Sequence, residues 1–144
     1  MEKHVINIVL IEDNPYEAEL AMRSLQSSNL GNSIIHIDDG ADALEYLMHD
    51  DFIAHGKRHL ILLDLNLPRI DGLEILKQMK RDEKRAMTPI IVLTSSKEER
   101  DIIESYKLGV NSYIVKPVNF ESFVSAMSDL KVYWLLLNQW PPAR

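Results

Sequence analysis

The sequence predicts a doubly wound α/β fold in which five parallel strands alternate with five helices. Five short runs rich in aliphatic and β-branched residues recur along the 144-residue chain, and each is almost continuously apolar. Parallel strands that are covered by helices on both faces have this pattern. The segments between the runs have helical apolar spacing, and 46% of the residues are hydrophobic. A chain of this size and composition can bury the core of a single domain spanning residues 1–144.

The five runs define the strands of the predicted sheet. They are Ile6–Ile11, Ser33–Ile37, Leu60–Leu63, Ile90–Leu93 and Ser112–Val115. His36 interrupts the second run, which suits an edge strand. Consecutive parallel strands need right-handed helical crossovers, so the helices cover both faces of the sheet. With the strand order 2-1-3-4-5, the result is a flavodoxin-like three-layer sandwich.

Each predicted helix follows a recognisable start signal. The signals are Asn14-Pro15, Asp39-Gly40, Asp71-Gly72, a capping box of Ser96 and Glu99, and Asn119. Capping side chains, a proline at the first helical position and turn glycines all favour helix starts. The helices run to about Leu25, over Ala41–Met48, over Leu73–Met79, to just before Gly109, and from Asn119 into the 130s as an extended C-terminal helix.

Composition excludes several classes of function. The net charge is −6, from 16 basic and 22 acidic residues, whereas a nucleic-acid partner requires a basic surface. Cysteine is absent, which excludes disulfides and thiolate metal sites. The N-terminus lacks a signal-peptide pattern, and the longest apolar run, Val132–Leu137, is too short to cross a membrane. We therefore expect a cytoplasmic protein without nucleic-acid or membrane partners.

Two of the predicted strands end in acids. Glu12 and Asp13 follow the first strand, and Asp64 follows the third. In an open parallel sheet, ligands bind beyond the carboxyl ends of the strands where the strand order reverses, here between strands one and three. Three carboxylates at this point would repel one another unless a hard cation such as Mg²⁺ lay among them. The alternative interpretation is that Glu12 and Asp13 are loop acids that cap the next helix.

Two further strand ends favour the cation site. The fourth strand ends in Thr94-Ser95 and the fifth in Lys116-Pro117, so a hydroxyl and an ammonium join the acids at the same edge. A carboxylate nucleophile, a metal and a second cation together suit a phosphoryl group on Asp64. Each residue alone could be an ordinary strand terminus, but four converging strand ends predict a phosphorylation site.

The motifs at these strand ends resemble those of the response-regulator receiver domains (CheY-like) of two-component systems. The matching stretches are VLIEDNP, LLDLNLPRIDG, PIIVLTSS and SYIVKPV, and the resemblance covers residues 5 to about 130. It implies that Asp64 is the phosphoacceptor. It also implies that Asp13 binds Mg²⁺ directly, Glu12 binds it through water, and the backbone carbonyl of Asn66 completes the metal site. Mn²⁺ could replace Mg²⁺ there.

The resemblance also implies a switch. Thr94 matches the switch hydroxyl, Tyr113 the switch aromatic residue and Lys116 the phosphate-binding lysine, and the Lys116–Pro117 peptide bond would be cis. A cis bond before proline costs only about 0.5–1 kcal/mol. In this family the phosphoryl group attracts the hydroxyl, and the aromatic residue moves into the vacated space. The surface of the fourth helix, fifth strand and fifth helix then changes.

The implied partners follow from the same family. A sensor histidine kinase donates the phosphoryl group, and the receiver catalyses its own phosphorylation and slow autodephosphorylation without being an enzyme in the ordinary sense. Asn66 and Ser96 would flank the path of the hydrolytic water. A downstream phosphotransfer protein or a docking partner would receive the signal. The long segment His49–His59 and the tail YWLLLNQWP resemble stand-alone receivers that partner phytochrome kinases, which would make light the signal.

The tail predicts a homodimer. Residues 131–144 form a C-terminal extension in which Val132, Tyr133, Trp134 and Leu136 belong to a segment that is apolar around its whole circumference. Such a helix must be covered on both sides, and a second subunit is the expected cover. The alternative is that the tail folds back on its own core. His55 and His59 could bind a metal, but a solvated loop is the expected interpretation.

Two other functions compete with this interpretation. A haloacid-dehalogenase-type phosphatase also forms an aspartyl phosphate, but it places a second acid two residues after the nucleophile, where this chain has Asn66. A receiver-like module could instead act by docking alone, without phosphorylation. The intact set of Asp13, Asp64, Thr94 and Lys116 argues against docking alone.

Overall fold

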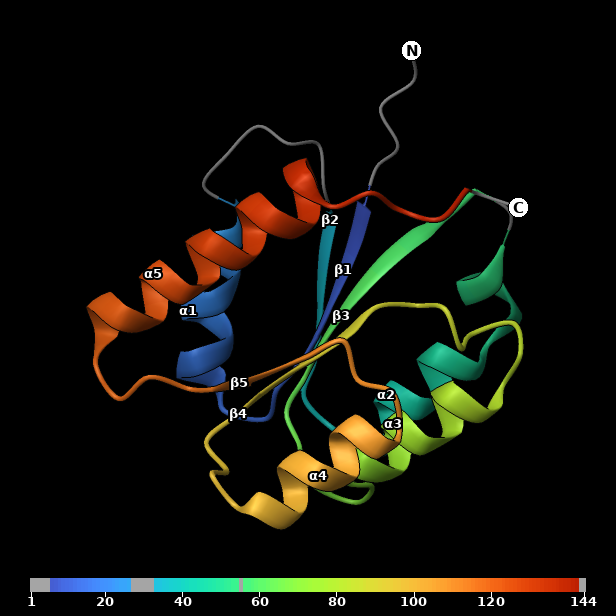
Figure 1. Ribbon diagram of the computed structural model, residues 1–144, viewed down its shortest axis with the longest axis horizontal. Helices are drawn as coiled ribbons and strands as arrows, with labels where there is room; N and C mark the ends of the chain where they lie inside the picture. Colours follow the sequence, from blue (N-terminus) through green and yellow to red (C-terminus); the bar gives the residue numbers. More distant parts are fainter. Residues whose placement is uncertain (1–5, 27–32, 55, 143–144) are drawn as a thin grey trace.

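A five-stranded parallel sheet forms the centre of the molecule (Figure 1). The computed structural model describes residues 6–26, 33–54 and 56–142. The strand order is β2-β1-β3-β4-β5, which confirms the predicted topology. The strands are β1 (Ile6–Ile11), β2 (Ser33–Ile37), β3 (Arg58–Leu63), β4 (Ile90–Thr94) and β5 (Ser112–Val115).

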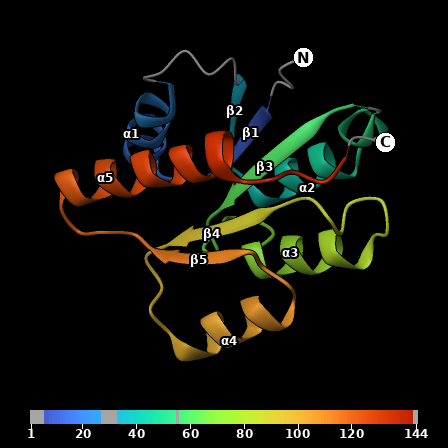
Figure 2. The same cartoon turned by 45° about the horizontal axis from the view of Figure 1, so that its top comes forward.

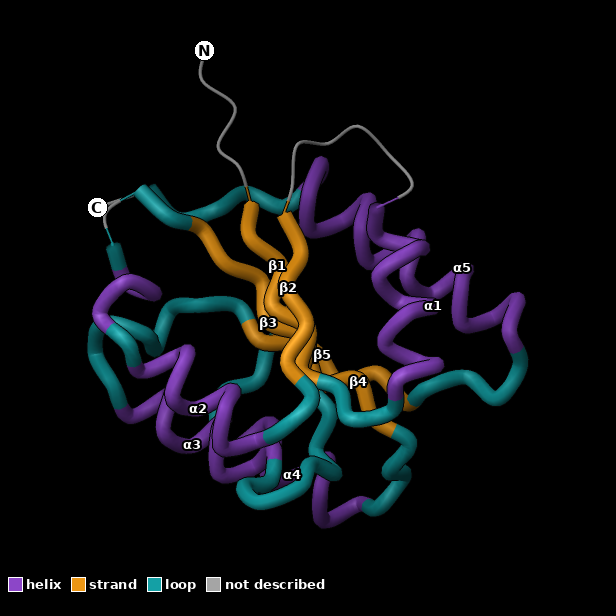
Figure 3. Tube along the Cα trace, turned by 180° about the vertical axis from the view of Figure 1, so that it is seen from behind, coloured by secondary structure: helices purple, strands orange, loops and turns teal. Residues whose placement is uncertain are grey.

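Helices cover both faces of this sheet (Figures 2 and 3). They are α1 (Pro15–Gln26), α2 (Gly40–Met48), α3 (Gly72–Arg81), α4 (Glu99–Lys107) and α5 (Phe120–Lys131). Helices α1 and α5 lie together on one face, and α2, α3 and α4 lie on the other. The predicted three-layer sandwich is therefore confirmed. No helix within the described residues has the length and apolar character needed to cross a bilayer.

The core consists of two apolar clusters, one on each side of the sheet. Because successive strand side chains point to opposite faces, Ile8 and Leu10 of β1 join the cluster under α1 and α5, whereas Val9 and Ile11 join the cluster under α2 and α3. Strands β3 and β4 divide their side chains in the same way. Burial on both faces explains why these strands have continuous apolar sequences.

The predictions for the starts of β3 and α4 are wrong in part. Strand β3 begins at Arg58, so His59 lies inside the strand and is buried, and the expected solvated loop is wrong for this residue. His55 lies outside the described residues. The expected capping box is also wrong, because α4 begins at Glu99 and its N-cap residue, Glu98, makes no side-chain capping bond. The Ser96 hydroxyl instead donates to Asp101 at 2.6 Å.

The C-terminal extension continues α5 and then returns to the core. A π-helical segment, η2 (Val132–Leu137), follows α5 directly. Trp140 is buried in the apolar cluster under α1 and α5, and its indole N–H donates to the carbonyl of Trp134 at 3.0 Å. The alternative in which the tail folds back on its own core is therefore realised at Trp140. Val132, Tyr133 and Leu136 nevertheless remain 40–58% exposed.

Two glycines, Gly72 and Gly40, allow the backbone of the loop from β3 to α3 to pack closely against neighbouring backbone atoms. A Cβ atom on Gly72 would lie 2.4 Å from the carbonyl oxygen of Asp64 and 2.7 Å from the Cα of Leu65. A Cβ atom on Gly40 would lie 1.6 Å from the carbonyl oxygen of Ile70. Since these neighbours are backbone atoms, they cannot move aside cheaply. Close backbone approach at Gly72 thus fixes Asp64, the residue that follows β3.

We expect Gly72→Ala to reduce the free energy of unfolding by about 3 kcal/mol, because overpacking against backbone atoms forces the loop to move. Urea unfolding measures this loss. Gly56→Ala is the matched control, since a Cβ atom there meets nothing within 4 Å and only the positive φ of 84° opposes it. The control should cost about 1 kcal/mol. Equal losses for the two variants would contradict the close-approach explanation.

Candidate functional site

The carboxyl ends of four strands meet at one edge of the sheet. Strands β1 and β3 pair in register up to Ile11 opposite Leu63, so the acids that follow them are neighbours. The Asp64 amide donates to the carbonyl of Ile11 at 3.0 Å and extends this ladder. At the ends of β4 and β5, the Lys116 amide donates to the carbonyl of Thr94 at 2.8 Å. The predicted convergence of strand ends is present.

Three carboxylates form the centre of this edge. Oxygen atoms of Glu12, Asp13 and Asp64 all lie within 4.8 Å of one another. Glu12 and Asp64 are buried, whereas Asp13 is exposed. Three acidic oxygen donors with one solvent-accessible member match the coordination preference of a hard divalent cation that keeps some of its waters. The residues present therefore fit the ion that the sequence predicts.

Lys116 lies among these acids. Its Nζ is 2.5 Å from Oε1 of Glu12, 2.7 Å from Oε2 of Glu17 and 3.0 Å from Oδ2 of Asp64. Burial alone would lower the pKa of Lys116, but its hydrogen bonds to Glu12 and Glu17 raise this pKa above the usual lysine value. Lys116 is thus a buried ammonium that stays charged beside the predicted phosphoacceptor.

Glu12 is the most deeply buried of the acids. Burial raises the pKa of Glu12 to about 7, and its hydrogen bond and ion pair with Lys116 oppose that rise. The backbone amide of Asn14 donates to Oε2 of Glu12 at 3.1 Å. The side chain of His36 in β2 forms a hydrogen bond with the backbone carbonyl of Glu12 at 2.7 Å. Glu12 is therefore fixed from three directions rather than serving as an exposed helix cap.

The predicted switch residues are connected through Ser96. Thr94 is fully buried, and its hydroxyl oxygen accepts a hydrogen bond from the Ser96 amide at 3.4 Å. The Tyr113 hydroxyl donates to the Ser96 carbonyl at 3.0 Å, and the Ser96 hydroxyl donates to Asp101 in the first turn of α4. Thr94, Tyr113 and α4 therefore contact one short loop.

Two finer predictions have different outcomes. The Asn66 amide donates to Oδ1 of Asp64 at 3.1 Å, which fixes the carboxylate, but the role of its carbonyl in metal binding stays a prediction. The predicted cis bond between Lys116 and Pro117 is wrong, because no peptide bond within the described ranges is cis. The trans isomer is the intrinsically favoured one even before proline, and Lys116 reaches Glu12 and Asp64 in this conformation.

The sequence prediction missed Glu17. This residue lies in the first turn of α1, four positions after Asp13, and its side chain reaches Lys116. The only available signal was that Glu17 follows the acids by a few positions in the sequence. It was missed because an acid in a first helical turn is common and also favoured by the helix dipole.

The proposed interface residues of the tail divide into two groups. Trp134 is partly buried and packs against Trp140, with ring centroids 5.9 Å apart. Val132, Tyr133 and Leu136 expose between 40% and 58% of their surface. The structure thus leaves three of the four residues accessible for a partner.

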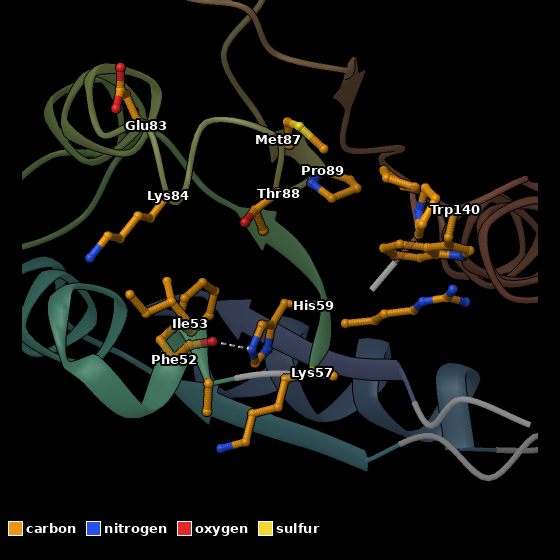
Figure 4. Close-up of a pocket in the computed structure, with 15 residues that line it drawn as sticks. Phe52, Ile53, Lys57, His59, Glu83, Lys84, Met87, Thr88, Pro89 and Trp140 are labelled. Atoms are coloured by element: carbon orange, nitrogen blue, oxygen red, sulfur yellow. Dashed lines mark hydrogen bonds between the residues drawn. The ribbon is translucent and has the colours of Figure 1, made fainter. Parts of the chain in front are cut away.

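A separate cavity of about 320 Å³ lies at the other end of the strands from the acids, near the amino ends of β3 and β4 (Figure 4). The segment before β3, the loop before β4 and the tail meet there. His59 stacks on Phe52 at 3.8 Å and bonds to the Phe52 carbonyl at 2.8 Å, and burial lowers the pKa of His59. His59 is thus a core residue of this region, and none of the strand-end acids lines the cavity.

Comparison with known proteins identifies the family. A model of the response regulator receiver domain matches residues 8–128. The chain is 38% identical over 134 residues to the probable methanogenesis regulatory protein FilR2 of Methanothrix harundinacea, covering 93% of this chain and 86% of that protein. It is 35% identical over 137 residues to response regulator Rcp1 of Synechocystis sp., covering 94% and 93%.

Solved structures agree with this assignment. The Mn²⁺-bound form of Rcp1 superposes with a TM-score of 0.85 at 32% identity, covering 94% of this chain and 99% of that one. The phosphorylated cyanobacterial phytochrome response regulator RcpA superposes with a TM-score of 0.87 at 34% identity, covering 94% and 98%. The chain belongs to the response regulator receiver domain family, and phytochrome response regulators are among its relatives.

Proposed function

We propose that this receiver accepts a phosphoryl group on Asp64 from a sensor histidine kinase. The observation that carries the proposal is the position of Lys116, whose Nζ lies 3.0 Å from Asp64 Oδ2 inside a cluster of acids. A carboxylate nucleophile beside a fixed cation can accept a phosphoryl group, because the cation stabilises charge on the transferring oxygens.

The chain's own residues would perform the transfer as follows. An oxygen of Asp64 attacks the phosphorus of the donor, and the bond between phosphorus and the donor's histidine nitrogen breaks. The nitrogen keeps the electron pair of that bond. Lys116 stabilises the phosphoryl oxygens through charge-assisted hydrogen bonds. The product is an aspartyl phosphate, which water would hydrolyse slowly along a path flanked by Asn66 and Ser96.

In this function, Asp13 and Asp64 would hold Mg²⁺ directly, Glu12 would hold it through water, and Asn66 would bind it through its carbonyl. When bound, the ion would supply positive charge that offsets the negative charge of the phosphoryl oxygens. Mn²⁺ could replace it, as supported by the Mn²⁺-bound form of the relative Rcp1.

Phosphorylation would then change the surface formed by α4, β5 and α5. The phosphoryl group attracts the Thr94 hydroxyl, which now accepts from the Ser96 amide. Because Tyr113 and Asp101 also bond to Ser96, a shift of this loop would reach β5 and α4 together. A docking partner or a phosphotransfer protein would read the changed surface.

We further propose a phytochrome-type kinase as the donor. RcpA, a phytochrome response regulator, is similar to this chain over 94% of its length. The segment before β3 and the tail, which suggested this subgroup, lie together around the cavity of Figure 4.

Incubation with acetyl phosphate and Mg²⁺, followed by intact-mass measurement, tests the phosphoacceptor function. The expected result is the gain of one phosphoryl group. A protein that gains none would refute phosphoryl acceptance and favour docking without phosphorylation. Multiple-turnover release of phosphate from small phosphomonoesters would instead favour the phosphatase alternative.

We also propose a homodimer through the exposed side chains of η2. Val132, Tyr133 and Leu136, together with the exposed Leu137, form a largely apolar surface on the extension of α5. Such a surface is normally covered by a partner. In a twofold interface each residue occurs once in each subunit. A substitution of one leucine therefore removes two leucines from the interface and doubles the loss of binding free energy.

We expect Leu136→Ser to weaken the dimer by about 100-fold or more, since burying one leucine contributes about 1.5–3 kcal/mol and the interface contains two. Light scattering over a concentration series, with and without beryllofluoride, measures this shift. Met87→Ser is the matched control, because Met87 is as exposed as Leu136 but lies in the loop before β4, outside both the extension and the surface of α4, β5 and α5. A monomeric mass for the unmodified protein in both conditions would exclude the dimer.

A further inference from the structure

Glu17 contacts the site but has no role in the proposed function so far. Its Oε2 accepts a hydrogen bond from Lys116 Nζ at 2.7 Å. Its side chain is 39% exposed, whereas the side chains of Glu12 and Asp64 are 3% and 6% exposed. Glu17 therefore reaches the buried ammonium from the solvent side of the site.

The first turn of α1 fixes this approach. The side-chain oxygen of Asn14 accepts hydrogen bonds from the amides of Tyr16 and Glu17 at 3.0 and 3.1 Å. The Asn14 amide in turn donates to Glu12. The first turn that carries Glu17 is thus tied to the Glu12 side chain, and the Glu17 side chain extends from this fixed backbone to Lys116.

The three contacts of Lys116 match its hydrogen-bonding capacity. A lysine ammonium has three N–H donors, and the structure places a carboxylate against each of them: Glu12, Glu17 and Asp64. A phosphoryl oxygen that binds Lys116 must therefore take the place of one carboxylate. Asp64 carries the phosphoryl group itself, and the Glu12 side chain is only 3% exposed, so water cannot replace Lys116 as its partner. Releasing Glu17 costs little, because this side chain can turn into water.

We propose that Glu17 is a positioning residue that holds the Lys116 ammonium before phosphorylation and gives it up to the phosphoryl group. This inference rests on the proposed phosphorylation of Asp64. The Glu17 carboxylate competes with the phosphoryl oxygens for Lys116, and its charge repels an anionic donor. Glu17 therefore slows phosphorylation and weakens the hold of the protein on phosphoryl-like anions.

The test compares Glu17→Gln with Glu19→Gln. Both variants remove one negative charge from α1, but Glu19 is exposed and pairs with Arg23 at 2.7 Å, away from Lys116. The assay uses saturating Mg²⁺ and acetyl phosphate below saturation. Under these conditions Glu17→Gln should gain its phosphoryl group about three to five times faster than the unmodified protein. This factor corresponds to the upper end of the interaction free energies of partly exposed ion pairs. Its affinity for beryllofluoride should rise by a similar factor.

Two further measurements separate this competition from a structural effect. Glu17→Asp keeps the charge near Lys116, so its phosphorylation rate should stay closer to that of the unmodified protein than to that of Glu17→Gln. High salt should reduce the advantage of Glu17→Gln, because mobile ions screen the charge that the variant removes. A purely structural role for Glu17 would give no such salt dependence.

The outcomes distinguish this inference from the proposed function. If the unmodified protein gains a phosphoryl group and Glu17→Gln is no faster than Glu19→Gln, the competition is excluded while phosphorylation stands. If the unmodified protein gains no phosphoryl group, the proposed function itself fails. Circular dichroism of all variants shows that the compared proteins are folded.

Discussion

Asp64→Asn is expected to abolish the phosphoryl gain from acetyl phosphate while leaving the protein folded. An amide has no anionic oxygen to attack phosphorus, so no aspartyl phosphate can form. The substitution keeps the shape of the side chain, and Lys116 retains Glu12 and Glu17 as partners. The free energy of unfolding should therefore change by no more than about 1 kcal/mol.

The same variant should lose affinity for Mg²⁺. It removes one of three carboxylates whose oxygens lie within 4.8 Å of one another. Because hard divalent ions bind through such charged oxygens, we expect the Kd for Mg²⁺, measured by calorimetry, to rise by about tenfold or more. Intact mass after treatment with acetyl phosphate measures the loss of phosphorylation.

Asp71→Asn is the matched control for Asp64→Asn. It makes the same chemical change at the other end of the same loop, where Asp71 caps α3 by accepting from the Glu74 amide at 3.0 Å. Asparagine caps a helix about as well as aspartate, so this control should remain stable and keep its phosphoryl gain. Phosphoryl gain in Asp64→Asn would place the acceptor on another residue, such as Asp13.

The sequence predicted the sheet and its edge well because both depend on local patterns. Apolar runs at Ile6–Ile11 and Ser112–Val115 define strands with the observed bounds. Parallel topology then brings the following residues together, so Asp13, Asp64 and Lys116 could be placed without any tertiary information.

The predictions that are wrong concern residues whose positions and contacts depend on tertiary packing. His59 follows charged and polar residues, but stacking on Phe52 places it inside β3. Ser96 has the spacing of a capping box, but its hydroxyl bonds to Asp101 instead. The return of Trp140 to the core depends on the shape of the apolar cluster on this side of the sheet, which no local pattern describes. Glu17 was missed for the same reason, because its role depends on a lysine 99 positions away.

Lys116→Met should lower both phosphorylation and stability. Without the ammonium, phosphorylation by acetyl phosphate should slow by about 100-fold or more, as is typical when a group that stabilises the transition state is removed. Methionine has similar length but no charge, so Glu12 and Asp64 become buried acids without their cation. Removing one partner of a buried ion pair costs about 3–5 kcal/mol.

This loss of stability should depend on pH. Burial already raises the pKa of Glu12 to about 7, and removal of Lys116 raises it further. An acid whose folded-state pKa lies above its unfolded value destabilises the fold as pH rises through that range, because the folded protein must release the proton. The difference in free energy of unfolding between the two proteins should thus be smaller at pH 5 than at pH 8. Urea unfolding without Mg²⁺ at both pH values measures it.

Two variants control this experiment. Lys107→Met removes one positive charge from the exposed end of α4 and should change stability little at either pH. Adding Glu12→Gln to Lys116→Met removes the buried acid that lost its partner, so the double variant should regain a large part of the lost stability at pH 8. A loss that is the same at both pH values and unaffected by Glu12→Gln would show that Lys116 stabilises the fold through packing of its aliphatic chain, rather than through its charge among the strand-end acids.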